Sequence, residues 1–312
     1  MSSTQYNVIA RPRRPVTPTA TTSMSLRQST TDYTLPDRTV ARDAGLLLLV
    51  PLALLGVFWL PSSVRSSLIV DYGDPSILTA YTSQLVHSTP QHLAVNLVGY
   101  GLFVSLEYVL STLCGRKRRF YHSYATFVLV FPPTLVGLDL LVINLGIGMG
   151  LSGLVMAFYG YLPLAMSDLV SERFGVASRT DVAPLLYFVG MAVVAILGLR
   201  PALENPTVAV GTAGLLLAIT LVILWYLRSI VADHDGLRAT ARTALQQPGD
   251  ADLFLVALVL LVLFPLCMFP ADPTTAGGVV NTYTHLLAFT LGFGVPFIAT
   301  VVDGGVDAVA SF

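Results

Sequence analysis

The chain has few charged residues. Asp, Glu, Lys and Arg make up 11% of its 312 residues, whereas roughly 25% is usual for a soluble globular protein. Apolar side chains make up 54%, and uncharged runs of about 20 residues, the length that crosses a bilayer, recur along the sequence. This composition excludes an ordinary soluble domain and predicts an integral membrane protein. The net charge of −1 gives no reason to expect a nucleic-acid partner.

Lysine, cysteine and the zinc-protease motif are also scarce or missing. Lys117, the only lysine, lies in a basic loop and cannot act as the base of a Ser–Lys pair. Cys114 and Cys267 fall near the ends of different spans that should face opposite sides of the membrane, which argues against a disulfide. No His-Glu-x-x-His sequence is present, which disfavours a zinc metalloprotease. We expect neither a metal nor a cofactor.

The first 43 residues differ in composition from the rest of the chain. Residues 1–43 are rich in Ser, Thr, Pro and Arg and contain scarcely any apolar cluster. Such a segment cannot bury enough apolar surface to offset the loss of chain entropy, so we expect a disordered cytoplasmic tail. Residues 44–312 then form the transmembrane domain.

Apolar runs long enough to cross a bilayer predict an all-α polytopic membrane protein with about eight transmembrane helices. Their boundaries are read from where the apolar runs begin and end. We place the spans near residues 44–60, 90–113, 120–143, 150–171, 183–200, 207–229, 252–270 and 281–302.

The basic residues are distributed unevenly between the predicted loops. If the first span runs outward, all of the 17 Lys and Arg residues except Arg65 and Arg200 lie in cytoplasmic segments. This asymmetry follows the positive-inside rule. We therefore expect both termini in the cytoplasm and a location in the plasma membrane of a prokaryote.

A single serine lies among glycines at the start of the fourth predicted span. Gly150 and Gly153 flank Ser152 closely, and the sequence that follows is apolar and helical. In the first turn of a helix the backbone N–H groups are unpaired and the dipole favours negative charge, so an oxyanion can be held there. Ser152 is therefore a candidate nucleophile. Small residues also serve close helix packing, so a nucleophile requires a base from another span.

The second predicted span begins with polar residues. Thr89 is a good N-cap and Pro90 suits the first helical position. His92 and Asn96 are four residues apart and share one helix face, while His87 lies just outside the helix. In the predicted orientation this end of the span is on the same side as the serine. Both side chains can donate hydrogen bonds to a developing oxyanion.

The last predicted span carries the candidate base. His285 lies about four residues from the start of this span, or roughly 6 Å in depth, comparable to Ser152. Histidine titrates near neutral pH, and the neutral imidazole is less costly in a dry site than a carboxylate. Ala288 and Gly292 lie on the same helix face and allow a partner helix to approach closely.

Together these residues resemble the rhomboid family of intramembrane serine proteases. The resemblance implies a rhomboid-like helical bundle that cleaves transmembrane segments of single-span membrane proteins near the outer face of the lipid bilayer. It implies that Ser152 is the nucleophile, that His285 is the base, and that the oxyanion donors lie in the second span, where His87 supports the helix start. The matching motifs are His87-x4-His92-x3-Asn96, Gly150-Leu-Ser152-Gly153, and His285 with Ala288 and Gly292.

The sequence departs from the family pattern at several points. A pair of spans at about 183–229 is inserted between the serine and histidine helices. Met156 stands where many members have a tyrosine that stacks on the histidine, so we expect Met156 or Tyr283 to orient His285. Ala288 replaces a usual glycine, and a Trp-Arg pair common in the first outer loop is absent.

Two acidic residues lie inside predicted spans. Glu107 resembles an acidic residue of the family's second span but sits one position early, and we expect it to bond backbone groups near the inner side. Asp139 has no acidic partner for an aspartyl dyad, and we expect it to bond Asn144 or a loop amide.

Two other functions remain open from the sequence. A catalytically silent rhomboid-like protein would bind transmembrane helices, but it would be expected to lack the serine or the histidine. A transporter or metal-handling protein would use His87, His92 and His285, because three histidines can ligate Zn²⁺. No carboxylate lies near these histidines in the sequence.

Overall fold

The computed structural model describes residues 37–142, 146–175, 179–232, 248–270, 274–275 and 278–310. The chain divides into residues 1–44 and 45–312, and the elements discussed below belong to the second unit apart from the start of α1. Most of the predicted tail lies outside the described residues. Residues 37–43 belong to α1, so this helix begins before the predicted boundary at 44.

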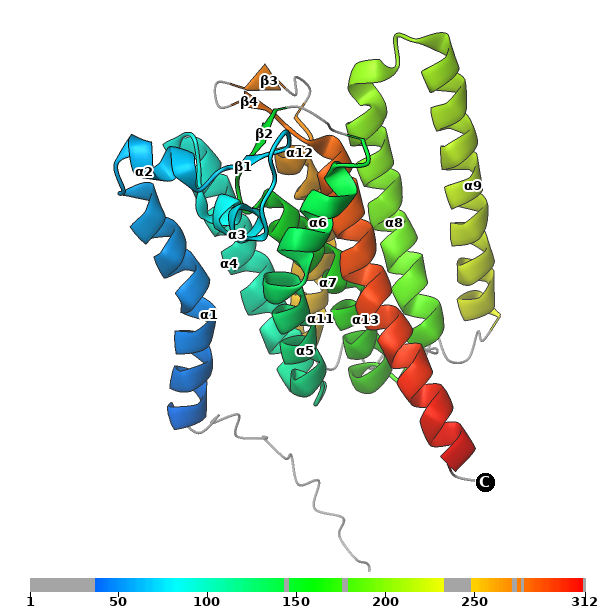
Figure 1. Cartoon of the computed structure of the whole chain (residues 1–312). Helices are drawn as coiled ribbons and strands as arrows, with labels where there is room; N and C mark the ends of the chain where they lie inside the picture. Colours follow the sequence, from blue (N-terminus) through cyan, green and yellow to red (C-terminus); the bar gives the residue numbers. More distant parts are fainter. Residues whose placement is uncertain are drawn as a thin grey trace, which may run out of the picture. The chain divides into compact units, whose positions relative to one another are not determined.

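The described elements are almost all helical (Figure 1). The longer helices are α1 (Asp37–Phe58), α4 (Pro90–Leu113), α5 (Lys117–Leu129), α7 (Ser152–Arg173), α8 (Arg179–Leu199), α9 (Pro206–Val231), α11 (Pro248–Leu263) and α13 (Thr282–Ala310). The shorter elements are α2 (Ser62–Ser67), β1 (Val70–Asp71), α3 (Ile77–Thr82), α6 (Phe131–Asp139), β2 (Ile147–Gly148), α12 (Pro265–Met268), β3 (Thr274–Thr275) and β4 (Gly278–Val279), with 3-10 turns at Ser83–Leu85 and Arg200–Ala202.

Seven described helices are long and apolar enough to cross a membrane. This confirms the prediction of an all-α, polytopic membrane protein, whereas the sidedness of the helices stays a prediction. The seven candidate spans are Thr39–Phe58, Pro90–Leu113, Ser152–Arg173, Arg179–Ala202, Pro206–Val231, Gly249–Met268 and Thr282–Val302.

The third predicted span, near 120–143, is not one helix. It consists of α5 and α6, which meet at Val130. Pro132 and Pro133 cause the break, because proline has no backbone N–H to continue the helical ladder. The carbonyl of Leu129 loses its partner at Pro133 and instead accepts a hydrogen bond from the Tyr81 hydroxyl.

α5 and α6 together still run the length of α7. α5 begins beside the C-terminal end of α7, where Arg116 pairs with Glu172 at 2.7 Å. α6 ends at Asp139, whose side chain bonds Thr284 in the first turn of α13. The two short helices therefore return the chain to the end where α4, α7 and α13 begin (Figure 1).

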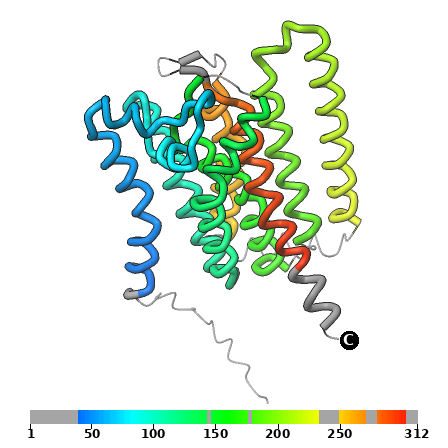
Figure 2. The backbone as a smooth tube through the Cα atoms, in the orientation of Figure 1, coloured from blue at the N-terminus to red at the C-terminus, as the bar shows by residue number. Residues whose placement is uncertain are grey.

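α7 lies at the centre of the bundle (Figure 2). Every residue from Gly153 to Leu169 is buried, as expected for a helix that is apolar on all sides. α4, α13, α8, α11 and α5 pack around it. α9 packs mainly against α8 and leaves most of its surface exposed, so the predicted inserted pair is a helical hairpin attached to α7 through α8.

Glycines let α7 and α13 pack backbone to backbone. A Cβ atom added at Gly160 would overlap the carbonyl oxygen of Phe289, and one added at Gly292 would overlap the carbonyl oxygen of Ala157. Small residues at such contacts are the usual way for helices to associate in lipid. The first turns of α7 and α13 are thereby held close together.

A proline inside α1 is compensated by a tyrosine from α4. Pro51 has no N–H to pair with the carbonyl of Leu47, four residues earlier. The Tyr100 hydroxyl donates to this carbonyl at 2.7 Å and is itself 2.9 Å from the Tyr124 hydroxyl. Because an unpaired carbonyl in lipid costs roughly several kcal/mol, this hydrogen bond stabilises the helix at the proline.

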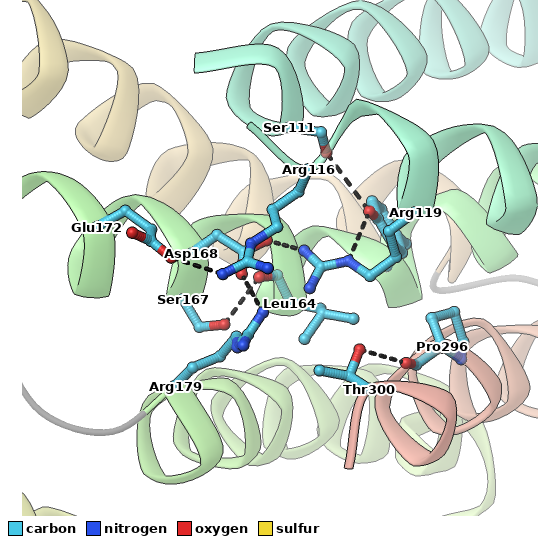
Figure 3. Close-up of polar contacts among 11 residues, drawn as sticks. Ser111, Arg116, Arg119, Leu164, Ser167, Asp168, Glu172, Arg179, Pro296 and Thr300 are labelled. Carbon is cyan, nitrogen blue, oxygen red and sulfur yellow. Dashed lines mark hydrogen bonds and ion pairs between the residues drawn. The ribbon is translucent and has the colours of Figure 1, made fainter. Parts of the chain in front are cut away.

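Charged residues gather at the C-terminal end of α7 (Figure 3). Asp168 is buried and pairs with Arg119 and with Arg179, the latter at 3.1 Å. Glu172 pairs with Arg116 at the surface. Asp168 is sixteen residues from Ser152, or about 24 Å along the helix, so these ion pairs are remote from the glycine-rich end.

Candidate functional site

The predicted site residues line one cavity of about 1040 Å³. The first turns of α4, α7 and α13 form its walls together with the end of α6 and with α12. Sequence reasoning selected seven site residues, and six of them line this cavity: Ser152, His285, Asn96, His92, Gly150 and Gly153. The seventh, His87, lies beside the turn that precedes Ser152.

Ser152 is the first residue of α7 and follows a sharp turn. Gly150 has φ of 106°, a conformation that glycine adopts readily, and its N–H donates to the carbonyl of Ser83 at 2.9 Å. Among the described residues, the first hydrogen bond of the α7 ladder runs from Val155 N to Leu151 O. The N–H groups of Ser152 and Gly153 are therefore available to an anion in the cavity.

Gly150 also makes room for His92. A Cβ atom at Gly150 would lie 2.7 Å from both Cε1 and Nε2 of the His92 ring. The ring therefore lies directly against the backbone that leads to Ser152. Only glycine permits this approach and the positive φ at once.

His87 holds the turn in front of the serine. The Leu151 N–H donates to His87 Nε2 at 3.4 Å, and His87 Nδ1 lies 3.3 Å from the Leu85 carbonyl oxygen. Both bonds suit one neutral tautomer, with the proton on Nδ1. Burial lowers the pKa of His87 to about 4, and the nearby His92 adds to the effect. That His87 supports the start of the second span stays a prediction, and the structure adds a contact with the residue before Ser152.

α4, which carries His92 and Asn96, begins where the sequence predicts it. Thr89 caps α4 by accepting a hydrogen bond from His92 N at 3.1 Å, and Pro90 is the first helical residue. Asn96 is buried, and its Nδ2 donates to the His92 carbonyl at 2.9 Å. An amide nitrogen carries two hydrogens, so one remains for an oxyanion in the cavity.

His285 is held by the segment around α12. Its Nδ1 lies 3.1 Å from the carbonyl oxygen of Met268. The Phe269 ring meets the imidazole edge-on, with ring centroids 5.6 Å apart. The carbonyl can only accept, so the proton is on Nδ1 and Nε2 keeps its lone pair.

Sequence reasoning did not find these two contacts. It expected Met156 or Tyr283 to orient His285. Met156 is fully buried in the core, and no hydrogen bond or ring contact joins Tyr283 to His285 within the described residues. A backbone carbonyl leaves no trace in sequence, because every residue has one.

The structure brings Ser152 and His285 to the same cavity without a hydrogen bond between them in the described part of the chain. Their neighbours are in contact: a Cβ atom at Gly153 would lie 3.5 Å from Cγ2 of Thr284. His285 is 4% exposed, whereas Ser152 is half-buried. Apo structures of enzymes often show catalytic hydrogen bonds that form only with substrate.

Asp139 connects three parts of the site. Its carboxylate accepts hydrogen bonds from Tyr72 at 2.8 Å, from Thr284 at 2.7 Å and from Asn281 at 3.3 Å. The expected partner, Asn144, lies outside the described residues, and the alternative of a loop amide is met by the side-chain amide of Asn281, which lies just before α13. Asn281 also caps α13, because its Oδ1 accepts from Thr284 N at 3.1 Å.

Glu107 differs from its prediction. It is fully buried in α4, and neither carboxylate oxygen has a hydrogen-bond partner among the described residues. The expected bonds to backbone do not form, because a helix interior leaves no free N–H for a side chain. Within the described residues no group of three or more His, Cys, Asp or Glu side chains is placed to hold a metal ion.

Comparisons with known proteins leave the family open. No family model matches the chain, and searches of curated proteins and of solved structures find no match. The helices and the cavity therefore carry the functional argument. The chain is a helical protein with seven candidate membrane-spanning helices among its described residues and a cavity with polar and apolar walls at the starts of three of them.

Proposed function

We propose that this protein is a rhomboid-like intramembrane serine protease that cleaves transmembrane segments of single-span membrane proteins by a Ser–His dyad. One observation carries the proposal. His285 donates a hydrogen bond from Nδ1–H to the Met268 carbonyl, which leaves Nε2 as the acceptor, and it lines the same cavity as a serine at a helix N-terminus. A serine nucleophile needs such a neutral imidazole.

The residues of the cavity have distinct roles in the reaction. Ser152 Oγ attacks the scissile carbonyl carbon, and its proton passes to His285 Nε2. The oxyanion that forms accepts hydrogen bonds from the Ser152 N–H, His92 and Asn96. His285 then returns the proton to the leaving amine. The acyl-enzyme is hydrolysed by a water that His285 deprotonates, which regenerates the serine.

The position of the cavity at the ends of candidate membrane spans supports a substrate inside the bilayer. Ser152 and His285 lie in the first turns of helices that have the length and apolarity of membrane spans. A helical substrate must unwind before its carbonyl can be attacked, because that carbonyl is hydrogen-bonded and shielded. Weak helix formers such as glycine near a small residue are therefore favoured at the cleavage site.

The test is cleavage of a single-span substrate protein by the full chain in liposomes. We expect the wild type to cleave and the activity of Ser152→Ala to fall by roughly 10⁶-fold, or to background. A serine-directed fluorophosphonate is expected to label the wild type and to lose this labelling in both Ser152→Ala and His285→Ala. Cleavage is expected to survive a chelator. Full activity in Ser152→Ala would refute the proposal.

A catalytically silent protein that binds transmembrane helices is the second candidate. It is favoured by the absence of a Ser152–His285 hydrogen bond in the described residues. Such a protein would crosslink to a single-span protein in liposomes equally well as wild type and as Ser152→Ala, and neither form would cleave it or react with the fluorophosphonate. Cleavage by the wild type alone separates the two functions.

A further inference from the structure

Asp139 is a buried carboxylate in the wall of the cavity. It is the last residue of α6 and is 2% exposed. Both of its oxygens accept from the Thr284 hydroxyl, at 2.7 and 2.8 Å. One oxygen also accepts from Tyr72 at 2.8 Å and from Asn281 at 3.3 Å. Three polar side chains thus converge on one carboxylate.

The surroundings of Asp139 suit a carboxylate that only accepts. Tyr72, Thr284 and Asn281 each donate a hydrogen to it. Burial and the neighbouring Asp139 raise the pKa of Tyr72 above its usual range, so this hydroxyl keeps its proton. Asp139 also lies at the N-terminus of α13, where the helix dipole favours negative charge. No Arg or Lys pairs with it among the described residues.

Two of these donors lie at the start of α13, next to the histidine: Asn281 caps the helix and Thr284 is in its first turn. Thr284 immediately precedes His285, and successive helical residues point about 100° apart. A Thr284 hydroxyl held by Asp139 therefore sets the rotation of this turn about the helix axis. His285 is directed toward Met268, whose carbonyl oxygen accepts a hydrogen bond from Nδ1–H. The turn is thus held on two sides, by α6 and by α12.

We propose that Asp139 is a positioning residue that holds the first turn of α13 through Thr284 and Asn281, so that His285 keeps the orientation in which Nδ1 meets the Met268 carbonyl. This inference rests on the proposed function in so far as His285 is the catalytic base. Asp139 acts through the backbone of α13, because no hydrogen bond joins it to His285 in the described residues. It is therefore not the third member of a triad.

The test compares variants of the full chain in liposomes. Asp139→Asn removes an acceptor, and Thr284→Val removes the bound hydroxyl while keeping the shape of the side chain. We expect kcat to fall by roughly 10²-fold in each, the size expected for a misplacement of about 1 Å, with KM within about threefold of wild type. Thr300→Val is the matched control. The Thr300 hydroxyl donates to Pro296 O at 2.8 Å, far along the same helix (Figure 3). The kcat of the Thr300→Val variant is expected to stay at the wild-type value.

A spectroscopic readout makes the proposal independent of catalysis. The ¹⁵N resonances of His285, assigned with His285→Gln, report which ring nitrogen carries the proton. We expect the Nδ1–H form in the wild type and in Thr300→Val, and a mixture of tautomers in Asp139→Asn and Thr284→Val. Failure of the proposed function would appear as a wild type without hydrolysis. Failure of the positioning role would appear as wild-type kcat, or wild-type ¹⁵N shifts, in both Asp139→Asn and Thr284→Val.

Discussion

The Nδ1 atom of His285 lies 3.1 Å from the carbonyl oxygen of Met268, the last residue of α12. This contact determines the tautomer of the imidazole, because a carbonyl oxygen accepts only from a protonated nitrogen. The segment before α13 thereby decides which ring nitrogen faces the cavity. The tautomer of the proposed base is thus determined by a tertiary contact with a residue outside its own helix.

Gly150 is expected to be required for a stable fold for two reasons that can be tested separately, its backbone conformation and its contact with His92. Its φ is 106°, and a Cβ atom there would also collide with the His92 ring at 2.7 Å. Gly146 has φ of 107° but open space around it. Gly146→Ala therefore carries the backbone strain alone, about 1–3 kcal/mol. We expect Gly150→Ala to lose substantially more thermal stability than Gly146→Ala and to lose cleavage of the single-span substrate. Equal melting temperatures for the two variants would contradict the collision with His92.

Protonation of His87 is expected to destabilise the protein in acid. Its pKa is about 4 in the folded state, against 6.5 for the unperturbed side chain. The unfolded state therefore binds more protons between these values, so this contribution is complete above pH 6.5 and is lost as the pH falls toward 4. The change amounts to at most about 3 kcal/mol. Unfolding midpoints measured as a function of pH should therefore fall as the pH is lowered from 6.5 to 4.

His87→Gln is the variant that isolates this effect. The Gln amide does not titrate, and its oxygen can accept the Leu151 N–H as the His87 ring does. The variant is expected to show a flatter dependence of stability on pH between 6.5 and 4. An unchanged dependence would assign the acid sensitivity to another group.

The Tyr159 hydroxyl is expected to compensate for a proline. It donates to the carbonyl of Leu261 at 2.8 Å, and this carbonyl has no helical partner because residue 265 is proline. Tyr159→Phe leaves the carbonyl buried and unpaired, at a cost of about 1–3 kcal/mol. Chemical denaturation in detergent micelles measures this loss.

A double-mutant cycle tests whether the Tyr159 hydroxyl replaces the N–H group that Pro265 lacks. Pro265→Ala restores an N–H that can pair with the Leu261 carbonyl. In that background Tyr159→Phe is expected to cost less than it does alone, and the difference is the coupling between the two residues. Strict additivity of the two substitutions would show that the hydroxyl has another role.

The buried and the exposed ion pairs at the C-terminal end of α7 are expected to differ in strength. Asp168 is buried between Arg119 and Arg179, whereas the side chains of Arg116 and Glu172 are 39% and 46% exposed. Asp168→Asn leaves charge unpaired in the interior and should cost about 3–5 kcal/mol. Glu172→Gln should cost about 1 kcal/mol or less. The unfolding free energies of the two variants, measured under the same conditions, test this difference. Similar losses in both variants would contradict it.

Much of the architecture can be predicted from the sequence, because a chain that crosses a bilayer can adopt few backbone structures. Apolar runs must become helices, since every backbone group needs an internal partner in lipid. Local signals such as Thr89 before Pro90 placed the start of α4 correctly. The third predicted span was wrong as a single helix, because hydropathy is insensitive to the missing N–H groups at Pro132 and Pro133.

The residue types of the candidate site follow from the sequence, and their arrangement does not. Polar side chains at the mouths of apolar helices stand out because they are costly there, which singled out Ser152, His285 and Asn96. Only the folded chain placed the Met268 carbonyl at His285 and the hydroxyl of Thr284 at Asp139. These contacts join residues far apart in the chain through backbone atoms and ordinary polar groups. Backbone atoms and ordinary polar groups form no recognisable sequence pattern, so these contacts are determined only by how the helices pack.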